Sequence, residues 1–582
     1  MKTVIVAVNS KYVHSSLAPW YLKASCDAGC GDVKVMEFTI NESPDVVLTR
    51  IYKEDCDVAA FSCYIWNIEF VHKICGNLKK VSPNIKIIYG GPEVSYCPQA
   101  ILRGNSFVDY VISGEAEITF NDLLLFLNKG IGKLSNVKGL SYKKNGEIIE
   151  SDSFSLVDNL DLISSPYTKE MLSFVGSRII YFESSRGCPF SCSYCISSTF
   201  EGIRYFSMAR VKSELKWLMS KGIKLIKFVD RTFNCNKERA KDIFKFIIDN
   251  VQQTMFHFEI AADLLDEEML ELLSRAPKGL IQFEIGVQST NQDTLAAVRR
   301  KTKLKEVLYY VNRLVEMGNI HIHVDLIAGL PLEGYDSFKS SFDDVFGLKA
   351  HNLQMGFLKM LKGSSIRKES ALYGYRFRDY PPYEVLGNKS ISFREMTRLK
   401  EIEEVLERYH NSSRFIKTLE YVIENYFSSP FVFFETLAQF YLNEGCFERS
   451  VSGRGLYTIF LRFLSNLENG ADIGLINELL KFDFLASNNT NNLPDGIERI
   501  YSKNFRGRCF EFLKYQENVE KYLPKFSGMT PKKIFTKIHF ELFNHNVLDN
   551  GQFLSGDNMV IMFNYDNYDK VLGHYEFAEV IL

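Results

Sequence analysis

The chain has 582 residues, enough for roughly three or four domains of ordinary size. Its 69 Lys and Arg residues nearly balance 71 Asp and Glu residues, and the formal net charge of −2 argues against a protein built mainly to grip nucleic acid. No long run of apolar residues is present, and the apolar stretch at residues 1–8 is too short for the core of a signal peptide. We therefore expect a cytoplasmic protein without a membrane span.

Short apolar runs alternate with helical patterns over residues 1–128, the first predicted domain. Strands are predicted at 4–8, 58–63, 85–89 and 108–112, and helices at 16–25, 68–81 and 117–128. This alternation is typical of an open parallel sheet of the Rossmann or flavodoxin-like type, in which ligands bind beyond the carboxyl ends of the strands. The loops that follow the four strands are therefore expected to meet at one edge: 9–14, 62–66, 90–95 and 114–117.

Residues 129–170 differ, because Asn145-Gly146 signals a β-hairpin and a Ser- and Asp-rich stretch follows as a linker. Over residues 171–385 the βα alternation returns, with strands predicted at 179–183, 225–229, 257–261, 280–287, 320–327 and 352–360. These βα units predict a partial (β/α)6 barrel, with its chemistry at the carboxyl ends of the strands.

Residues 386–582 are predicted to form a mostly helical, aromatic-rich C-terminal domain. Helices are expected at 394–409 and 416–426, and strands at 560–565 and 577–582. The segment 503–537 is basic and aromatic. We interpret it as a solvated face over a buried aromatic stripe, with a nucleic-acid contact as the alternative.

Three of the 12 cysteines crowd together directly after a predicted strand: Cys188, Cys192 and Cys195, in the spacing C-x3-C-x2-C. Thiolates bind zinc and iron–sulfur clusters. A structural zinc site needs four ligands, and no fourth Cys or His lies near in sequence. Three thiolates on one loop can instead hold three irons of a 4Fe–4S cluster, which leaves the fourth iron open to a ligand that reacts.

This cysteine spacing resembles the signature of the radical S-adenosylmethionine (SAM) superfamily. Residues 226–234, 283–300 and 324–331 further resemble its FxDxxF, GxQSxNxxxLxxxxR and DLIxGLP segments. The resemblance implies a 4Fe–4S cluster on the three cysteines, SAM at the open iron and Tyr194 near the adenine. Asp230, Glu259, Gln288 and Asp325 become candidates to contact SAM, and for each the alternative is a strand-end or capping residue. We interpret His257, His321 and His323 as structural histidines of the barrel.

The first domain resembles the cobalamin-binding fold of methyl-transfer enzymes. That family carries D-x-H-x-x-G after its first strand, where this chain has Tyr12 in place of the Asp and Leu17 in place of the Gly. His14 is left either as a cobalt ligand, as a neighbour of the cofactor or as a structural residue. The candidate cobalamin-binding residues are His14, Ser62, Gly90, Gly91, Pro92, Glu93, Ser95 and Glu115.

As a whole, the chain resembles cobalamin-binding radical SAM proteins of the class B methyltransferase group that carry an uncharacterised C-terminal domain. The resemblance implies methylation of an unactivated carbon, or of phosphorus, by hydrogen abstraction and transfer from methylcobalamin. The alternatives are a non-methylating radical cyclase or rearrangement enzyme and a radical tRNA-modifying enzyme. We expect an electron donor such as flavodoxin or ferredoxin, a small-molecule or peptide substrate, and a C-terminal domain that covers the barrel mouth or serves only for packing.

Overall fold

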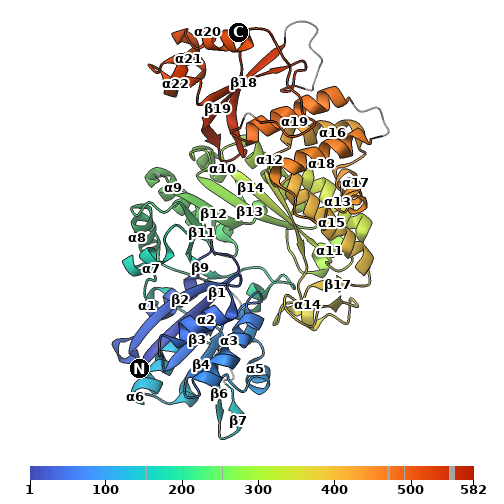
Figure 1. Ribbon diagram of the computed structural model, residues 1–582. Helices are drawn as coiled ribbons and strands as arrows, with labels where there is room; N and C mark the ends of the chain where they lie inside the picture. Colours follow the sequence, from blue (N-terminus) through green and yellow to red (C-terminus); the bar gives the residue numbers. More distant parts are fainter. Residues whose placement is uncertain (151–153, 201, 252, 468–471, 491, 550–557) are drawn as a thin grey trace.

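The computed structural model describes residues 1–582 apart from 151–153, 201, 252, 468–471, 491 and 550–557. Residues 151–153 of the predicted linker thus lie outside the described residues. The chain forms three successive parts, with the N-terminal sheet at one end, the barrel in the middle and the C-terminal domain at the other end (Figure 1). In the described part of the chain, no helix has the length and apolar character needed to cross a membrane.

The N-terminal part is an open sheet whose five parallel strands run in the order β2-β1-β3-β4-β5. They are β2 (Asp32–Thr39), β1 (Lys2–Asn9), β3 (Val58–Ser62), β4 (Lys86–Gly90) and β5 (Tyr110–Ile112). This is the flavodoxin-like order, and it confirms the predicted fold class. In such sheets the ligand lies where the strand order reverses, here at the carboxyl ends of β1 and β3.

Helices cover both faces of this sheet, which explains the continuous apolar runs of its strands. Val4, Val6 and Val8 of β1 pack under the helices of one face, whereas Ile5 packs toward those of the other. The first face carries α2 (Pro44–Tyr52), α3 (Ile68–Val81) and α5 (Pro98–Gly104), and the second carries α1 (Leu17–Ala24) and α6 (Glu117–Lys129).

The predicted hairpin is present as β6 (Leu140–Lys144) and β7 (Glu147–Ile149). β6 pairs antiparallel with β5, so the hairpin extends the N-terminal sheet to seven strands. The sheet therefore continues past residue 128, where the sequence placed the end of the first domain.

The middle part is a sheet of six parallel strands in the order β15-β14-β13-β12-β11-β8, as predicted for a partial barrel. They are β8 (Ile180–Phe182), β11 (Leu225–Phe228), β12 (Met255–Ile260), β13 (Ile281–Gln288), β14 (His321–Ala328) and β15 (Asn352–Phe357). The outer layer consists of α8 (Met208–Met219), α9 (Lys237–Asn250), α10 (Glu267–Ser274), α11 (Gln292–Ala297), α12 (Leu304–Met317) and α13 (Tyr335–Phe346).

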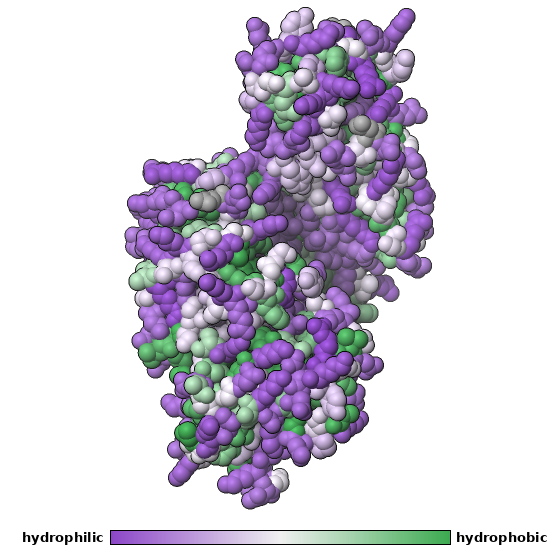
Figure 2. Space-filling view, turned by 60° about the vertical axis from the view of Figure 1, so that its left-hand side comes forward, coloured by the Kyte–Doolittle hydropathy of each residue, from purple (hydrophilic) through white to green (hydrophobic). Residues whose placement is uncertain are grey.

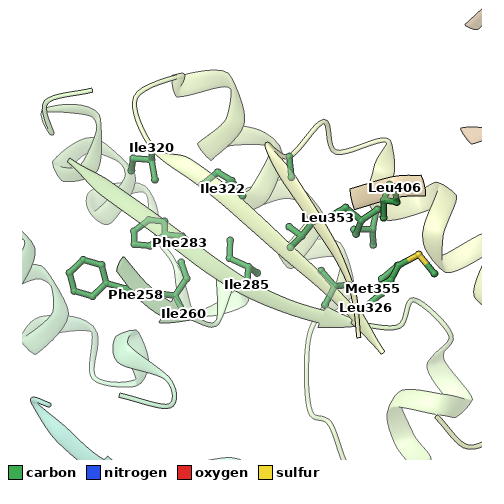
Figure 3. Packing of buried hydrophobic residues seen from close by; sticks show 14 of the residues in the cluster. Phe258, Ile260, Phe283, Ile285, Ile320, Ile322, Leu326, Leu353, Met355 and Leu406 are labelled. Atoms are coloured by element: carbon green, nitrogen blue, oxygen red, sulfur yellow. The ribbon is translucent and has the colours of Figure 1, made fainter. Parts of the chain in front are cut away.

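Side chains alternate strictly along the barrel strands. Phe258, Phe283, Ile322 and Leu353 are buried in the apolar core (Figure 3), whereas the residues that alternate with them along β12, β13 and β14 are partly exposed and mostly polar. Burial of the first set stabilises the barrel, at about 25 cal/mol per Å² of apolar area. The second set leaves a polar inner face.

The C-terminal part begins with the short strands β16 (Arg376–Phe377) and β17 (Val385–Gly387). Helices follow: α15 (Phe393–Tyr409), α16 (Ile416–Tyr426), α17 (Pro430–Asn443), α18 (Gly453–Ser465), α19 (Ile473–Ser487), α20 (Phe505–Phe512), α21 (Gln516–Tyr522) and α22 (Pro531–Ile534). After these helices the chain forms an antiparallel sheet of β18 (Ile538–Phe543), β19 (Met559–Asp569) and β20 (His574–Glu579). The mostly helical character is as predicted.

These helices pack on the outer side of the barrel (Figure 1), and the expectation that the C-terminal domain covers the barrel mouth stays a prediction. Leu406 of α15 lies beside Met355 of β15 (Figure 3), and Phe342 of α13 packs edge-to-face on Phe431 of α17. Between the barrel and the C-terminal helices the surface is hollowed and largely hydrophilic (Figure 2). In segment 503–537, Phe512 and Phe526 are buried in a local core, which agrees with the interpretation as a buried aromatic stripe.

Candidate functional site

A cavity of about 660 Å³ lies between the carboxyl ends of the N-terminal strands and the barrel loop that bears the cysteines. Gly187, Ile196 and Ser197, on both sides of the cysteine triplet, form part of its wall. Seven of the eight residues predicted to bind cobalamin also line it: His14, Ser62, Gly90, Gly91, Pro92, Ser95 and Glu115.

The Gly90-Gly91 loop comes close to neighbouring backbone. Gly91 has φ of +108°, and a Cβ there would lie 2.6 Å from the carbonyl oxygen of Cys63, so only glycine fits. Ser95 Oγ donates to the Gly91 carbonyl at 2.8 Å and braces the loop. Ser62 Oγ, by contrast, is buried without a hydrogen-bond partner among the described residues, and it can serve a ligand in the cavity.

His14 is held at the junction of the two domains. Its backbone forms a parallel bridge to Ile179, and its Nδ1 lies 2.7 Å from the hydroxyl of Tyr181 on β8. Burial lowers the pKa of His14, and Lys11 and Lys227 lower it further, so the imidazole is neutral at pH 7. Tyr181 thus fixes the orientation of the imidazole ring. This contact could not be predicted from the sequence, because the partners are 167 residues apart.

Glu93 is the exception among the predicted cobalamin residues, because it does not line the cavity. Its side chain is 4% exposed and points away from the cavity, where Oε1 contacts Lys362 Nζ at 2.6 Å and accepts from the Tyr383 hydroxyl at 2.6 Å. Glu93 therefore joins the N-terminal domain to the segment after β15 and to the start of the C-terminal domain.

Glu115 lines the cavity, but its carboxylate is already paired across the domain interface. It accepts two hydrogen bonds from Arg204, at 2.6 and 2.8 Å, and lies 3.6 Å from Arg186. Arg186 also donates to Glu117 at 2.6 Å and to Glu183 at 3.0 Å. Burial raises the pKa of Glu183 to about 7, although Arg186 opposes the shift. This charged cluster forms one wall of the cavity, directly before Cys188.

The cysteine loop runs from the two-stranded ribbon of β9 (Ser185–Gly187) and β10 (Ile203–Tyr205) to the short helix η4 (Ile196–Thr199). Both end cysteines of the triplet contact a neighbouring polar group. Cys188 Sγ lies 3.6 Å from Thr232 Oγ1, and the Ser197 amide donates to Cys195 Sγ at 3.4 Å. In the middle, the Ser193 amide donates to Val298 O at 2.9 Å. The loop geometry is thus imposed by the barrel.

Arg300 is a site residue to which the sequence assigned no role, although it closes the GxQSxNxxxLxxxxR run. Its Nη1 lies 3.2 Å from the Tyr194 hydroxyl and 3.9 Å from Cys192 Sγ, and its Nη2 donates to Gly286 O. The neighbouring Cys192 and Tyr194 raise the pKa of Arg300 despite burial, which keeps it charged. A fixed positive charge beside the loop favours thiolate over thiol.

Asp230 lies beneath this loop, not at its surface. It is 1% exposed and accepts from the Ser184 amide, Ser184 Oγ and Ser185 Oγ at 3.0, 2.7 and 2.5 Å. These bonds engage both carboxylate oxygens and favour the alternative role of a strand-end residue over a contact with SAM. Asp230 instead anchors the strand that leads into the cysteines.

Glu259, Gln288 and Asp325 lie on the polar inner face of the barrel, as predicted. In the register of the sheet, Glu259 stands opposite Glu284, and Asp325 stands opposite Gly286. Lys227 and His257 bind Glu284 at 3.0 and 2.9 Å, and they lower its pKa to about 2 against the effect of burial.

Asp325 has no charged partner of that kind: its Oδ1 lies 3.3 Å from Nε2 of His323, and burial lowers the pKa of that imidazole. Burial and the charges of Glu284 and Glu259 raise its pKa to about 8, so it is largely protonated at neutral pH and can donate a hydrogen bond. Among the described residues, the buried atom Gln288 Oε1 has no hydrogen-bond partner, and neither His323 Nε2 nor Asp325 Oδ1 has one beyond the 3.3 Å contact between the two. Such atoms are costly to bury unless a ligand or water satisfies them.

These residues fit the cofactors that the sequence implies. Three thiols on one loop suit an iron–sulfur cluster. The unpartnered atoms of the inner face suit a polar ligand beside that loop. The interdomain cavity, with its glycine loop and free Ser62 hydroxyl, suits a large ligand with many hydrogen-bonding groups.

Comparison with known families assigns each of the three parts. Residues 3–124 match the B12 binding domain, residues 182–345 match the radical SAM superfamily, and residues 371–563 match a family described only as a protein of unknown function, DUF4080.

Curated relatives match over part of their length. An uncharacterized methyltransferase of Pyrococcus horikoshii is 33% identical over 36% of this chain and 48% of its own. The 2-(S-pantetheinyl)-carbapenam-3-carboxylate methyltransferase of Streptantibioticus cattleyicolor is 25% identical over 56% of this chain and 50% of its own. The anaerobic magnesium-protoporphyrin IX monomethyl ester cyclase of Synechocystis is 28% identical over 39% of this chain and 46% of its own. The chain thus spans about half the length of these relatives.

Solved structures share the fold. The cobalamin-dependent SAM radical enzyme OxsB, with aqua-cobalamin and SAM bound, has a TM-score of 0.57 at 14% identity over 83% of this chain and 78% of that one. The radical SAM methyltransferase TsrM of Kitasatospora setae has a TM-score of 0.53 at 16% identity over 65% of this chain and 80% of that one.

Fold, site and comparisons together define the class: a B12-binding domain followed by a radical SAM domain. The match to the DUF4080 family over residues 371–563 completes this arrangement.

Proposed function

We propose that this protein is a cobalamin-dependent radical SAM methyltransferase that acts at an unactivated carbon or at phosphorus. The observation that carries the proposal is the shared cavity. Its walls combine the carboxyl ends of the N-terminal strands with residues on both sides of the cysteine triplet, so two cofactors would face each other across one space. When bound, the cluster and SAM would supply hydrogen abstraction and methylcobalamin would supply the methyl group.

The chain itself would supply position and a defined environment. Cys188, Cys192 and Cys195 would hold the cluster, with Arg300 fixing Tyr194 and the loop. Ser62 and the Gly90-Gly91 loop would hold cobalamin. Both domains bury the cavity between them, which limits the access of water to reactive species.

The substrate would bind against the inner face of the barrel. That face offers both hydrogen-bond donors and acceptors, with Glu284 charged and Asp325 largely protonated at neutral pH. These groups support a polar substrate, either a small molecule or a peptide. We further propose that a flavodoxin or ferredoxin reduces the cluster.

Anaerobic reconstitution tests the cofactors. The purified protein is loaded with iron, sulfide and hydroxocobalamin, desalted, and examined by absorption spectroscopy and metal analysis. We expect retained corrinoid and a 4Fe–4S spectrum, and we expect the cluster to be lost when Cys188, Cys192 and Cys195 are all replaced by Ala. Cys235→Ala is the matched control and should keep the cluster. A wild-type protein that retains no corrinoid would refute the proposal.

A second candidate is a radical cyclase, which the similarity to the magnesium-protoporphyrin ester cyclase favours. The two reactions differ in their products from SAM. Methyl transfer yields 5′-deoxyadenosine together with S-adenosylhomocysteine, whereas cyclisation yields 5′-deoxyadenosine alone. The cluster is reduced in the presence of candidate substrates, and both products are then measured by chromatography. The result distinguishes methyl transfer from cyclisation.

A further inference from the structure

The segment 362–366 follows β15 and includes the first two residues of α14 (Ser365–Lys368), and it contacts both loops that face the cavity. We propose that this segment, here called the strut, fixes the glycine loop of the N-terminal domain relative to the cysteine loop, with Lys362 as its positioning residue. The proposal rests on the proposed function only in that each loop holds its cofactor.

The first contact of the strut is a buried ion pair. Lys362 Nζ lies 2.6 Å from Glu93 Oε1 and 3.4 Å from the Glu93 carbonyl oxygen, and the Tyr383 hydroxyl donates to the same Oε1 at 2.6 Å. Glu93 follows Gly90-Gly91-Pro92, so these bonds hold the glycine loop from behind. A carboxylate that is 4% exposed is stable only while it stays paired, and this makes the contact specific.

The second contact is steric. Gly363 has φ of +86°, and a Cβ there would lie 2.5 Å from the ring of Tyr96, so the ring packs directly on the backbone of the strut. On its far side, the Tyr96 hydroxyl lies 2.8 Å from Thr199 Oγ1, four residues after Cys195. Tyr96 therefore touches the strut and the end of the cysteine loop at once.

The third contact reaches the cysteine loop itself. The amide of Ile366 donates to Ser193 O at 2.9 Å, between Cys192 and Cys195. Within five residues the chain thus binds the glycine loop at Lys362, the Tyr96 ring at Gly363 and the cysteine loop at Ile366. Ordinary interdomain packing would not require one short segment to reach both loops by directed hydrogen bonds.

The test measures the relation between the two cofactors in the full-length protein. Wild type and Lys362→Met are loaded with cluster and cobalamin and reduced. The magnetic interaction between cob(II)alamin and the reduced cluster is then recorded by pulsed electron paramagnetic resonance. In Lys362→Met, we expect a broader range of cobalt–cluster distances and a Kd for hydroxocobalamin that rises roughly tenfold.

Three further variants complete the design. Lys362→Arg keeps the charge and should restore most of the wild-type behaviour. Tyr383→Phe removes a single hydrogen bond and should shift both measurements in the same direction by less, even if Lys362→Met folds poorly. Lys368→Met alters an exposed lysine of the adjoining helix and should match wild type.

The outcomes separate the two proposals. A wild-type protein that binds both cofactors, with Lys362→Met and Tyr383→Phe indistinguishable from Lys368→Met, overturns the strut and leaves the proposed function intact. A wild-type protein that binds no corrinoid overturns both.

Discussion

The hydrogen bond between Tyr181 and His14 decides which nitrogen of the imidazole carries the proton. A phenol hydroxyl is a better donor than acceptor, so we assign it as the donor to Nδ1 at 2.7 Å, which places the proton on Nε2. A protonated Nε2 cannot ligate a metal. The contact therefore favours His14 as a hydrogen-bond donor to the cavity over His14 as a cobalt ligand.

This assignment predicts the spectrum of bound cob(II)alamin. Electron paramagnetic resonance of the wild type should show no nitrogen splitting that changes on ¹⁵N-histidine labelling, and His14→Ala should give the same spectrum. In Tyr181→Phe, Nδ1 loses its donor, so the other tautomer and ligation become accessible. A label-sensitive splitting in wild type that disappears in His14→Ala would contradict the assignment.

Glu333 is a buried carboxyl without a cation, and it gives a pH-dependent stability. It follows β14, is 1% exposed, and its Oε1 accepts from Ser289 Oγ and Ser341 Oγ at 2.6 and 2.9 Å. Burial raises its pKa to about 7, although the two hydroxyls oppose the shift. The folded state then holds the proton more tightly than the unfolded state, so stability falls as the pH rises from about 4.5 to 7.

Glu333→Gln should lack this slope. Relative to wild type, the variant should gain stability between pH 5 and pH 8, on the order of 3 kcal/mol at 1.36 kcal/mol per pKa unit. Thermal unfolding of both proteins at the two pH values measures the change. Glu316→Gln, at an exposed position of α12, should show no such gain. Equal differences at pH 5 and pH 8 would show that Glu333 is ionised in the fold.

At the scale of elements, the β9–β10 ribbon depends on one glycine. Gly187 has φ of +103°, and a Cβ there would lie 2.2 Å from the carbonyl oxygen of Gly202 across the ribbon. Gly202 has φ of +83° and no atom within 4 Å of its own Cβ position. An alanine would strain the backbone at both positions, but only at position 187 would its Cβ also clash with a neighbouring atom.

Gly187→Ala should therefore distort the start of the cysteine loop and lower iron incorporation severalfold. Gly202→Ala, the matched control, should lose only about 1–2 kcal/mol of stability and keep the cluster. Iron and sulfide content after reconstitution, with thermal unfolding, distinguishes the two. Normal cluster content in Gly187→Ala would show that the ribbon does not set the loop geometry.

The sequence predicted the elements well where periodicity is strong. The six barrel strands and α3 were found, because each is a buried run of β-branched or aromatic residues or has a clear helical face. β2 was missed because it lies at the edge of its sheet, where exposed Asp32 and Lys34 interrupt the apolar pattern. α2, which begins at Pro44, was missed with it.

The candidate site was predictable only in part, for a related reason. The cysteines and the glycine loop are local patterns and could be recognised from spacing. The roles of Glu93 and Asp230 depend on partners that the fold brings to them, and spacing alone does not show whether a polar residue at a strand end faces a ligand or supports a loop.

At the scale of the whole molecule, charged pairs join the first two domains. Arg204 binds Glu115 with both terminal nitrogens and also donates to Val157 O at 2.6 Å. The side chains of Arg204 and Glu115 are 23% and 16% exposed, whereas Arg275 and Glu271 on the barrel surface are 64% and 71% exposed. The buried pair should therefore matter far more than the exposed one.

Arg204→Met leaves the Glu115 carboxylate with the Val157 amide, which donates to it at 2.7 Å, and with the more distant Arg186 as its remaining cation. We expect a loss of roughly 2–5 kcal/mol in the docking of the two domains, seen as faster hydrogen exchange at residues 113–117. Arg275→Met, the control, should change stability by less than about 1 kcal/mol. Unchanged protection in Arg204→Met would mean that apolar packing alone holds the interface.

The cavity between these domains has a thermodynamic consequence. A ligand that touches both walls binds only when they are docked, so its binding free energy adds to the stability of the interface itself. A ligand at a concentration of a hundred times its Kd stabilises the docked state by about 2.7 kcal/mol. Without a ligand in the cavity, the two domains should accordingly unfold in separate thermal steps, and with a ligand bound these steps should lie closer together. Occupancy of the cavity therefore sets how far the two domains behave as one cooperative unit.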